Sequence, residues 1–175
     1  MDELNLIQLD FKPTHLLKPL QLDIAKIIKK QVKIYYVNRE ISDCYNEKRQ
    51  QYDAVKILNK FINEVENKKT IIFTSLDLCI PIFTYVFGLA KLGGFAAIVS
   101  SHRLRNEFYG LPANDRLLQT RLLKETIHEY GHLLELRHCN NYDCVMVSSM
   151  TVDDIDVKSA EFCKRCLAKM EKDWK

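Results

Sequence analysis

The residues with the clearest chemical potential are two histidines and a glutamate within one short run, His128-Glu129-Tyr130-Gly131-His132. Residues four apart lie on the same face of a helix, so both imidazoles can reach one metal ion. Glu129 lies beside them, placed to take a proton from a water molecule that the metal activates. The HExxH spacing therefore predicts a catalytic zinc site in which Glu129 is the general base.

A third histidine extends this pattern. His138 lies six residues after His132, beyond the expected end of the helix. Three histidine ligands leave one tetrahedral position open, as a catalytic zinc requires. The extended spacing is typical of the metzincin peptidases. We therefore expect His128, His132 and His138 to hold the catalytic zinc; a helix with unrelated histidines is the weaker alternative.

Four of the six cysteines fall in the last quarter of the chain, as Cys139-x4-Cys144 and Cys163-x-x-Cys166. Two close pairs separated by a loop suit a zinc ion held by four thiolates. Such a site has no open position, so its role would be structural; unpaired reduced thiols are the alternative. The remaining two cysteines stand apart and are expected to be small buried side chains: Cys44 and Cys79.

The run from His128 to Met146 resembles the archaemetzincin family, whose signature is HExxHxxGxxHCx4CxM followed by a later CxxC. The similarity extends over roughly residues 32–166 and includes several upstream blocks: Tyr45-Asn46, residues 49–54 (RQQYDA), Asp77-Leu78, residues 86–88 (VFG), and Ser100 with Arg103-Leu104. The resemblance implies a zincin-like (metzincin) fold, one catalytic and one structural zinc ion, and metallopeptidase activity. It also implies that Met146 belongs to the Met-turn, the apolar floor beneath the catalytic zinc.

The chain departs from the family pattern at Glu135, where the family has a glycine that lets the chain turn sharply. A glutamate held at positive φ would cost about 1–2 kcal/mol, although the turn could use another conformation. His138 depends on this turn. Some metzincins place a tyrosine near the metal two residues after the Met-turn methionine; position 148 is serine here, so no tyrosine ligand is expected.

The histidines require a long helix to position them. Asn114 or Asp115 is the expected N-cap, and the helix should run to about Leu134. Its apolar stripe recurs at helical spacing and should face the core: Leu123, Ile127, Tyr130 and Leu134. Two cations one and two turns before His128 are interpreted as solvated: Arg121 and Lys124. Arg103 and Asp77 are expected to be structural partners.

Upstream of this helix, hydrophobic periodicity predicts helices over residues 20–30 and 50–63, and strands over residues 33–37 and 70–75. Residues 85–90 and 95–101 should form a β-hairpin, with Gly93 and Gly94 supplying positive φ in its turn. The fold class is therefore α/β, with a small mixed sheet and an antiparallel edge strand packed on helices. We expect one domain over residues 1–175, and a peptide substrate extended along Tyr85–Ala90.

Composition limits the other possibilities. Of the 175 residues, 47% are hydrophobic and 28% are charged, which is ordinary for a globular protein. The net charge of +3 is spread along the chain, so no nucleic-acid partner is expected. Asp77 and Pro81 interrupt the apolar stretch 70–90, which favours buried strands over a membrane span. The N-terminal segment lacks the pattern of a signal peptide, so we expect a cytoplasmic protein. We also expect it to be a monomer.

Two alternative functions stay open. The chain could be a zinc-stabilised binding module with an inactive catalytic site, an interpretation kept open by Glu135. The cysteine segment could also be a zinc ribbon that contacts nucleic acid, encouraged by Lys164 and Arg165. The surrounding acidic residues oppose that second alternative: Asp153, Asp154, Asp156 and Glu161.

Overall fold

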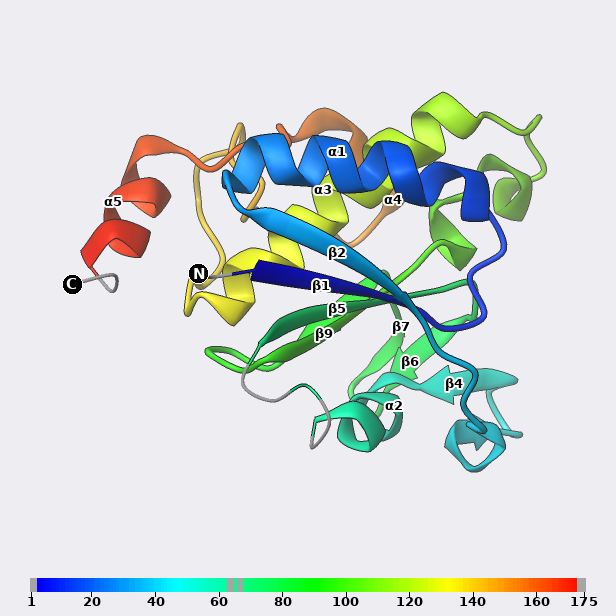
Figure 1. Ribbon diagram of the computed structural model, residues 1–175. Coiled ribbons are helices and arrows are strands. Elements are labelled where there is room, and N and C mark those ends of the chain that lie inside the picture. The colour runs from blue at the N-terminus through cyan, green and yellow to red at the C-terminus, as the bar shows by residue number, and fades with distance from the viewer. Residues whose placement is uncertain (1–2, 63–64, 66–67, 173–175) are drawn as a thin grey trace.

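The computed structural model describes all residues except 1–2, 63–64, 66–67 and 173–175, and has two β-sheets and five α-helices (Figure 1). The larger sheet has the order β2-β1-β5-β9-β8, in which neighbours are parallel except for the antiparallel pair β8–β9. Its strands are β1 (Glu3–Gln8), β2 (Gln31–Tyr36), β5 (Lys69–Thr74), β8 (Gly88–Ala90) and β9 (Ala96–Ser100). The expected mixed sheet with an antiparallel edge strand is confirmed.

Helices cover both faces of this sheet. In Figure 1, α1 (Leu17–Ile28) and α3 (Asp115–Leu133) lie above the sheet and α2 (Ala54–Phe61) lies below it. The strands alternate accordingly: Ile71 and Phe73 face the α1–α3 core, whereas Ile72 and Ile98 face the α2 core. Because side chains of a strand alternate between faces, an almost wholly apolar run such as residues 70–73 can fill both cores at once.

A smaller sheet extends one side of the molecule, with the order β3-β4-β6-β7. Arg49 holds its turn between β6 and β7: the guanidinium donates hydrogen bonds to the backbone oxygens of Ile80 (2.8 Å), Phe83 (2.9 Å) and Pro81 (3.2 Å). The strands of this sheet are β3 (Tyr45–Asn46), β4 (Gln51–Asp53), β6 (Leu78–Ile80) and β7 (Phe83–Val86).

The hairpin β8–β9 is confirmed, but the prediction of one strand over residues 85–90 is wrong. The segment changes sheets at Phe87: β7 pairs with β6, and β8 pairs with β9. Gly93 has φ of +67°, as expected for the turn, whereas Gly94 does not have positive φ. The helix predicted over residues 50–63 is shorter, because Asp53 caps α2; Asn63 lies outside the described residues.

The predicted long helix is confirmed as α3, and Asn114 is its N-cap, accepting a hydrogen bond from the backbone N–H of Leu117 (3.0 Å). The interpretation of Arg121 and Lys124 as solvated residues is wrong. Both are buried: Arg121 forms a paired contact with Asp156 (2.7 and 2.6 Å), and Lys124 donates to two backbone oxygens. The expected pairing of Arg103 with Asp77 is confirmed by two short hydrogen bonds, 2.6 and 2.8 Å.

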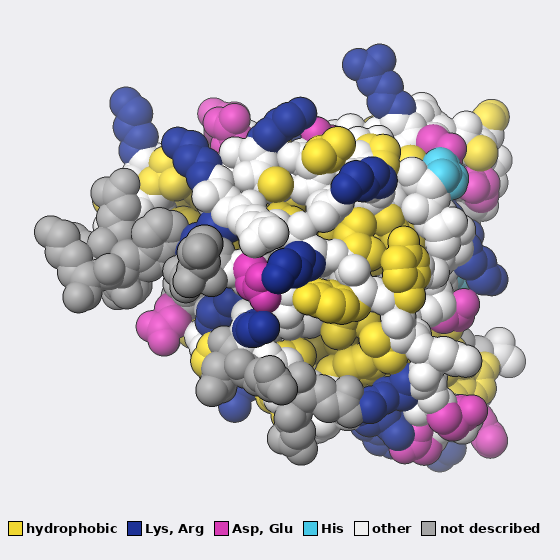
Figure 2. Space-filling view, viewed as in Figure 1, with side chains coloured by type: hydrophobic (Ala, Val, Ile, Leu, Met, Phe, Trp, Pro, Cys, Tyr) yellow, Lys and Arg dark blue, Asp and Glu magenta, His cyan; other side chains and the backbone are white. Residues whose placement is uncertain are grey.

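The chain after α3 contains two short helices, α4 (Val152–Val157) and α5 (Lys164–Lys172). Thr151 and Asp154 form a capping box that starts α4, and Lys158 is the C-cap that follows it. No helix in the described part of the chain is both long enough and apolar enough to cross a bilayer. On the face shown in Figure 2, lysines and arginines are scattered among acidic residues and do not gather in one basic patch.

Candidate metal centres and catalytic cleft

The three predicted histidines meet at one point. One ring nitrogen from each histidine lies within 4.8 Å of the other two, and the ring centroids are 4.7 Å (His128–His132), 5.4 Å (His128–His138) and 5.0 Å (His132–His138) apart. His128 and His132 come from the last turns of α3, and His138 comes from the loop that follows. The structure therefore brings together the predicted ligand set, including His138, whose position depends on the turn at Glu135.

Backbone oxygens orient two of these rings. His128 Nδ1 lies 2.8 Å from the Val145 oxygen, and His132 Nδ1 lies 2.7 Å from the Leu136 oxygen. In a neutral ring, an Nδ1–H that donates to a carbonyl leaves Nε2 as an acceptor. The two Nε2 atoms then face each other at 3.1 Å, two lone pairs with no proton between them. A cation resolves this arrangement, so the donor set fits a zinc ion.

Burial lowers the pKa of all three histidines, most strongly for His128, whose pKa lies well below the ordinary histidine value. The neutral imidazole, which is the form that binds metal, is therefore favoured over the imidazolium. The lowered pKa values and the facing Nε2 atoms therefore both indicate neutral histidine rings that are ready to bind a metal ion.

The turn after α3 explains how Glu135 is accommodated. Its φ is +63°, so the left-handed conformation is adopted despite the side chain. The N–H of Leu136 donates to the Gly131 oxygen (3.0 Å) and the N–H of Glu135 donates to the His132 oxygen (3.1 Å), which is the Schellman pattern with Glu135 at the position that favours glycine. The turn is thus kept, and His138 returns to the other two histidines.

Met146 lies beneath the histidine helix and is fully buried. A Cβ at Gly131, between the two helical histidines, would collide with the Met146 sulfur. Only glycine permits this close approach of the helix to the methionine. The segment that carries Met146 is joined to the loop after α3, since the Cys139 N–H donates to the Met146 oxygen (2.9 Å).

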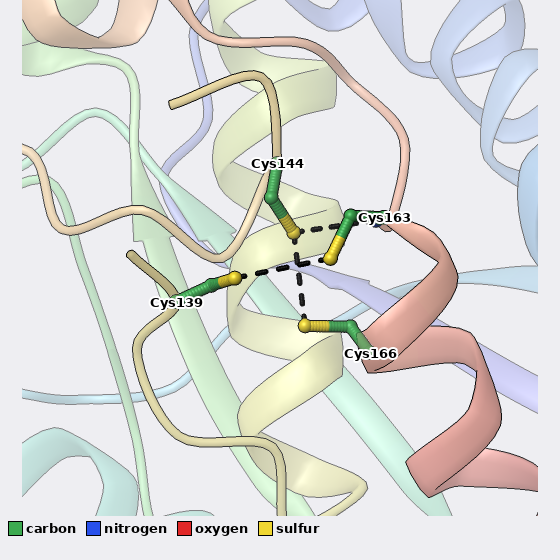
Figure 3. Close-up of side chains that lie close together, drawn as sticks. All are labelled: Cys139, Cys144, Cys163 and Cys166. Carbon is green, nitrogen blue, oxygen red and sulfur yellow. Dashed lines mark hydrogen bonds between the residues drawn. The ribbon is translucent and has the colours of Figure 1, made fainter. Parts of the chain in front are cut away.

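The four predicted cysteines form a second centre, at the other end of the same loop. Figure 3 shows their sulfurs pointing toward a common point, two from the loop after α3 and two from the start of α5. Sulfur atoms lie 3.8 Å (Cys139–Cys163) and 3.7 Å (Cys144–Cys166) apart. Four sulfurs each about 2.3 Å from a zinc ion would be separated by about 3.8 Å, whereas a disulfide needs about 2.0 Å. The set fits tetrahedral zinc.

The two isolated cysteines, Cys44 and Cys79, are buried, as expected.

Burial raises the pKa of the Cys163 thiol, but hydrogen bonds from the Cys166 backbone and from the neighbouring thiols outweigh it and bring the pKa down to about 6. At least one sulfur of the cluster is therefore ready to act as a thiolate near neutral pH.

A cavity of about 260 Å3 opens beside the three histidines. Its lining includes the segment that runs from β7 to β8, with Phe83, Tyr85 and Phe87, and also Met150 from the loop before α4. Tyr85 joins these two parts of the lining, because its hydroxyl donates to the Met150 oxygen (2.7 Å). The cleft is therefore lined both by apolar side chains and by the three histidines.

Glu129 lines this cavity and is almost fully buried. A Cβ at Gly88 would lie 2.7 Å from Glu129 Oε1, so the carboxyl group rests directly on the backbone of β8. Burial, and then the negative charge of Glu125, raise the pKa of Glu129 well above the ordinary range. A dication at the histidines would act in the opposite direction and favour the carboxylate.

Two further residues of this cavity were not predicted from the sequence: Glu125 and Lys158. Glu125 precedes Glu129 by four residues, so helical spacing places the two on one face and could have identified it. Lys158 follows α4 and reaches the cavity only through the packing of the chain, for which the sequence holds no local signal.

An α/β fold whose long helix presents two histidines and a buried glutamate to a cleft, where a third histidine from the following loop joins them, defines a zinc-dependent metallopeptidase. The chain belongs to Peptidase family M54, whose family model matches residues 10–172. It is 44% identical to an archaemetzincin of Methanocaldococcus jannaschii over 128 residues, which cover 73% of this chain and 70% of the relative. It is 43% identical to an archaemetzincin of Saccharolobus solfataricus over 131 residues, covering 74% and 70%.

Solved structures agree with this assignment. A zinc-dependent peptidase from Methanocorpusculum labreanum superposes with a TM-score of 0.88 at 32% identity, covering 95% of this chain and 99% of the other. The archaemetzincin of Archaeoglobus fulgidus, solved in complex with malonate, gives 0.82 at 32% identity with the same coverage. The metzincin-like fold and the archaemetzincin family are confirmed, and the enzyme interpretation is favoured over the binding module.

Proposed function

We propose that this chain hydrolyses peptide bonds at the three-histidine centre, with His128, His132 and His138 as zinc ligands and Glu129 as the general base. The observation that carries the proposal is the convergence of these histidines in a cleft that a buried carboxyl group also lines. A zinc ion held there supplies the Lewis acidity that activates water and polarises the scissile carbonyl.

The chain's own residues divide the remaining work. The backbone oxygens of Val145 and Leu136 hold two histidine rings in the orientation that turns Nε2 toward the centre. Glu129 takes a proton from the attacking water and passes it to the leaving amine. Met146 and Phe87 are apolar and buried, which lowers the local dielectric and strengthens the electrostatic interactions inside the site.

The substrate would lie extended along β8. Among the described strands, β8 is at the edge of the larger sheet and pairs with β9 alone. An extended peptide can add to such an edge through backbone hydrogen bonds while alternate side chains enter neighbouring pockets. The apolar walls formed by Phe83 and Tyr85 favour a substrate side chain that is itself apolar.

A second zinc ion would be structural. The four cysteines form a closed set, so an ion there would hold the loop of residues 139–146 to α5 without an open position for substrate. This proposal brings the metal content of the working enzyme to two zinc ions.

The test is Glu129→Gln in protein loaded with zinc, with Glu161→Gln, an exposed glutamate outside the cleft, as the matched control. We expect Glu129→Gln to keep the wild-type zinc content and to lose about 10²- to 10⁴-fold in kcat on a fluorogenic peptide. Glu161→Gln should retain full turnover. Wild-type turnover by Glu129→Gln would refute the assignment of the base.

A further inference from the structure

Three ionisable side chains lie together behind the histidines, although burial of this kind is rare: Glu125 (6% exposed), Glu129 (4%) and Lys158 (2%). All three line the cleft. Lys158 Nζ lies 4.0 Å from Glu125 Oε2, and Glu125 and Glu129 lie one turn apart on the same face of α3. Lys158 therefore lies beside Glu125, and Glu125 lies one helical turn before the proposed base.

These groups are incompletely satisfied. Lys158 donates one hydrogen bond in the described structure, to the Val147 oxygen (3.2 Å), and one carboxyl oxygen of each glutamate has no hydrogen-bond partner there. Burying a charged group costs several kcal/mol unless it is paired and hydrogen-bonded. A cluster that is buried and only partly paired is poorly explained by stability alone.

Lys124 shows what a structural buried lysine looks like in the same protein. It is nearly as buried, at 8% exposed, yet it donates to the backbone oxygens of Ile155 (2.9 Å) and Asp156 (2.7 Å), and joins α3 to α4. Lys158 approaches carboxyl groups instead, and Asp154 on α4 adds a third negative charge to its surroundings. The two lysines therefore form a matched pair, one structural and one facing the cleft.

We infer that Glu125 and Lys158 are positioning residues for Glu129. Glu125 braces the Glu129 carboxyl group from one helical turn away, while the backbone at Gly88 confines it from the other side. Lys158 supplies the positive charge that lets two carboxyl groups stay together in this buried place. This inference rests on the proposed function, in which Glu129 acts on the attacking water.

Lys158 should affect zinc affinity and turnover in opposite directions, weakening the first and supporting the second. A positive charge that shares a cavity with the histidines repels a bound cation, and it also stabilises the carboxylates beside it. Lys158→Met should therefore bind zinc at the histidine centre at least as tightly as the wild type, while kcat falls by about 10- to 100-fold, the usual range for residues behind a metal centre. KM should change little, because neither Lys158 nor Glu125 lies on the β8 edge.

The experiment compares Lys158→Met with Lys124→Met in protein that retains the cysteine-bound zinc. Zinc affinity at the histidine centre is measured by competition with a chromogenic chelator, kcat and KM with a fluorogenic peptide, and stability by thermal unfolding. Lys124→Met should lower stability and leave kcat close to the wild-type value. Lys158→Met with wild-type kcat, or with a loss of kcat matched by an equal loss of zinc affinity, would overturn the inference.

Two further variants keep the test decisive. If Lys158→Met does not fold, Glu125→Gln, which preserves the shape of the side chain, should lower kcat without loss of bound zinc; unchanged kcat would overturn the inference. In the double variant Glu129→Gln/Lys158→Met, the second change should have no added effect, because Lys158 acts through Glu129. An inactive Glu129→Gln beside a fully active Lys158→Met rejects only this inference, whereas an active Glu129→Gln rejects the proposed function itself.

Discussion

Replacing Glu135 by glycine and, separately, by alanine isolates the backbone strain in the turn that returns His138 to the other histidines. Both variants remove the glutamate side chain, so they differ only by one Cβ at a residue with φ of +63°. Comparing them cancels the contribution of the carboxylate, which favours the charged form of Lys69. The difference between the two variants therefore reports the conformation of the turn alone.

The magnitude follows from two opposing terms. A residue with a Cβ in the left-handed conformation costs about 1–2 kcal/mol relative to glycine. The glycine variant in turn loses about 0.5–1 kcal/mol of stability, because glycine has more conformational freedom to lose when the chain folds. We therefore expect Glu135→Gly to be more stable than Glu135→Ala by about 0.5–1 kcal/mol. For a protein of this length, each kcal/mol corresponds to a shift in Tm of about 2–4 °C.

The assay is thermal or urea unfolding of both variants with zinc bound, and Thr120 is the control position. Thr120 is exposed and lies inside α3, so there alanine should exceed glycine by about 1 kcal/mol, the reverse sign. If alanine equals or exceeds glycine at position 135 as well, the left-handed turn is not formed in solution, and the path that brings His138 to the site would be refuted.

Two other predictions concern the metal centres. Cys163→Ser should cost zinc at both centres, measured by elemental analysis, because the cysteine-bound ion holds the loop that carries His138 and Met146; loss of one zinc with the histidine centre intact would contradict this coupling. The metal-free protein should lose stability as pH falls below about 6.5, the ordinary histidine value. Burial lowers the pKa of the three histidines, so below that pH the unfolded chain binds more protons than the folded one and acid favours unfolding. Urea midpoints between pH 8 and 5 check this, and a flat or rising profile would contradict it.

The catalytic helix and both ligand sets could be predicted from the sequence because their signals are local. Residues four apart share a helical face whatever surrounds them, and Asn114 caps α3 through its own neighbouring backbone. The turn at Glu135 is the instructive exception. Intrinsic preference argued against a left-handed glutamate, and the hydrogen bonds of the turn overrode that preference.

The features that were not predicted depend on contacts between distant parts of the chain. β1 was not predicted, although it is the second strand of the larger sheet, because it has only six residues and the alternation of Leu4 and Leu6 with polar residues covers only part of it. Residues 85–90 read as one strand, since no local signal marks the change of sheet at Phe87. Arg121 and Lys158 carry charges that suggest solvent, and only their partners on other elements explain their burial.

The three hydrogen bonds of Arg49 have a consequence for which side chains can line this cleft. Arg49 contacts backbone oxygens rather than side chains, so it fixes the turn between β6 and β7 whatever residues stand there. Phe83, at the end of that turn, lines the cleft. The side chains at this rim can therefore be exchanged without loss of the backbone that presents them. Arg49 therefore stabilises the backbone of the turn, while the side chains of the turn can change in size and polarity to alter substrate selectivity.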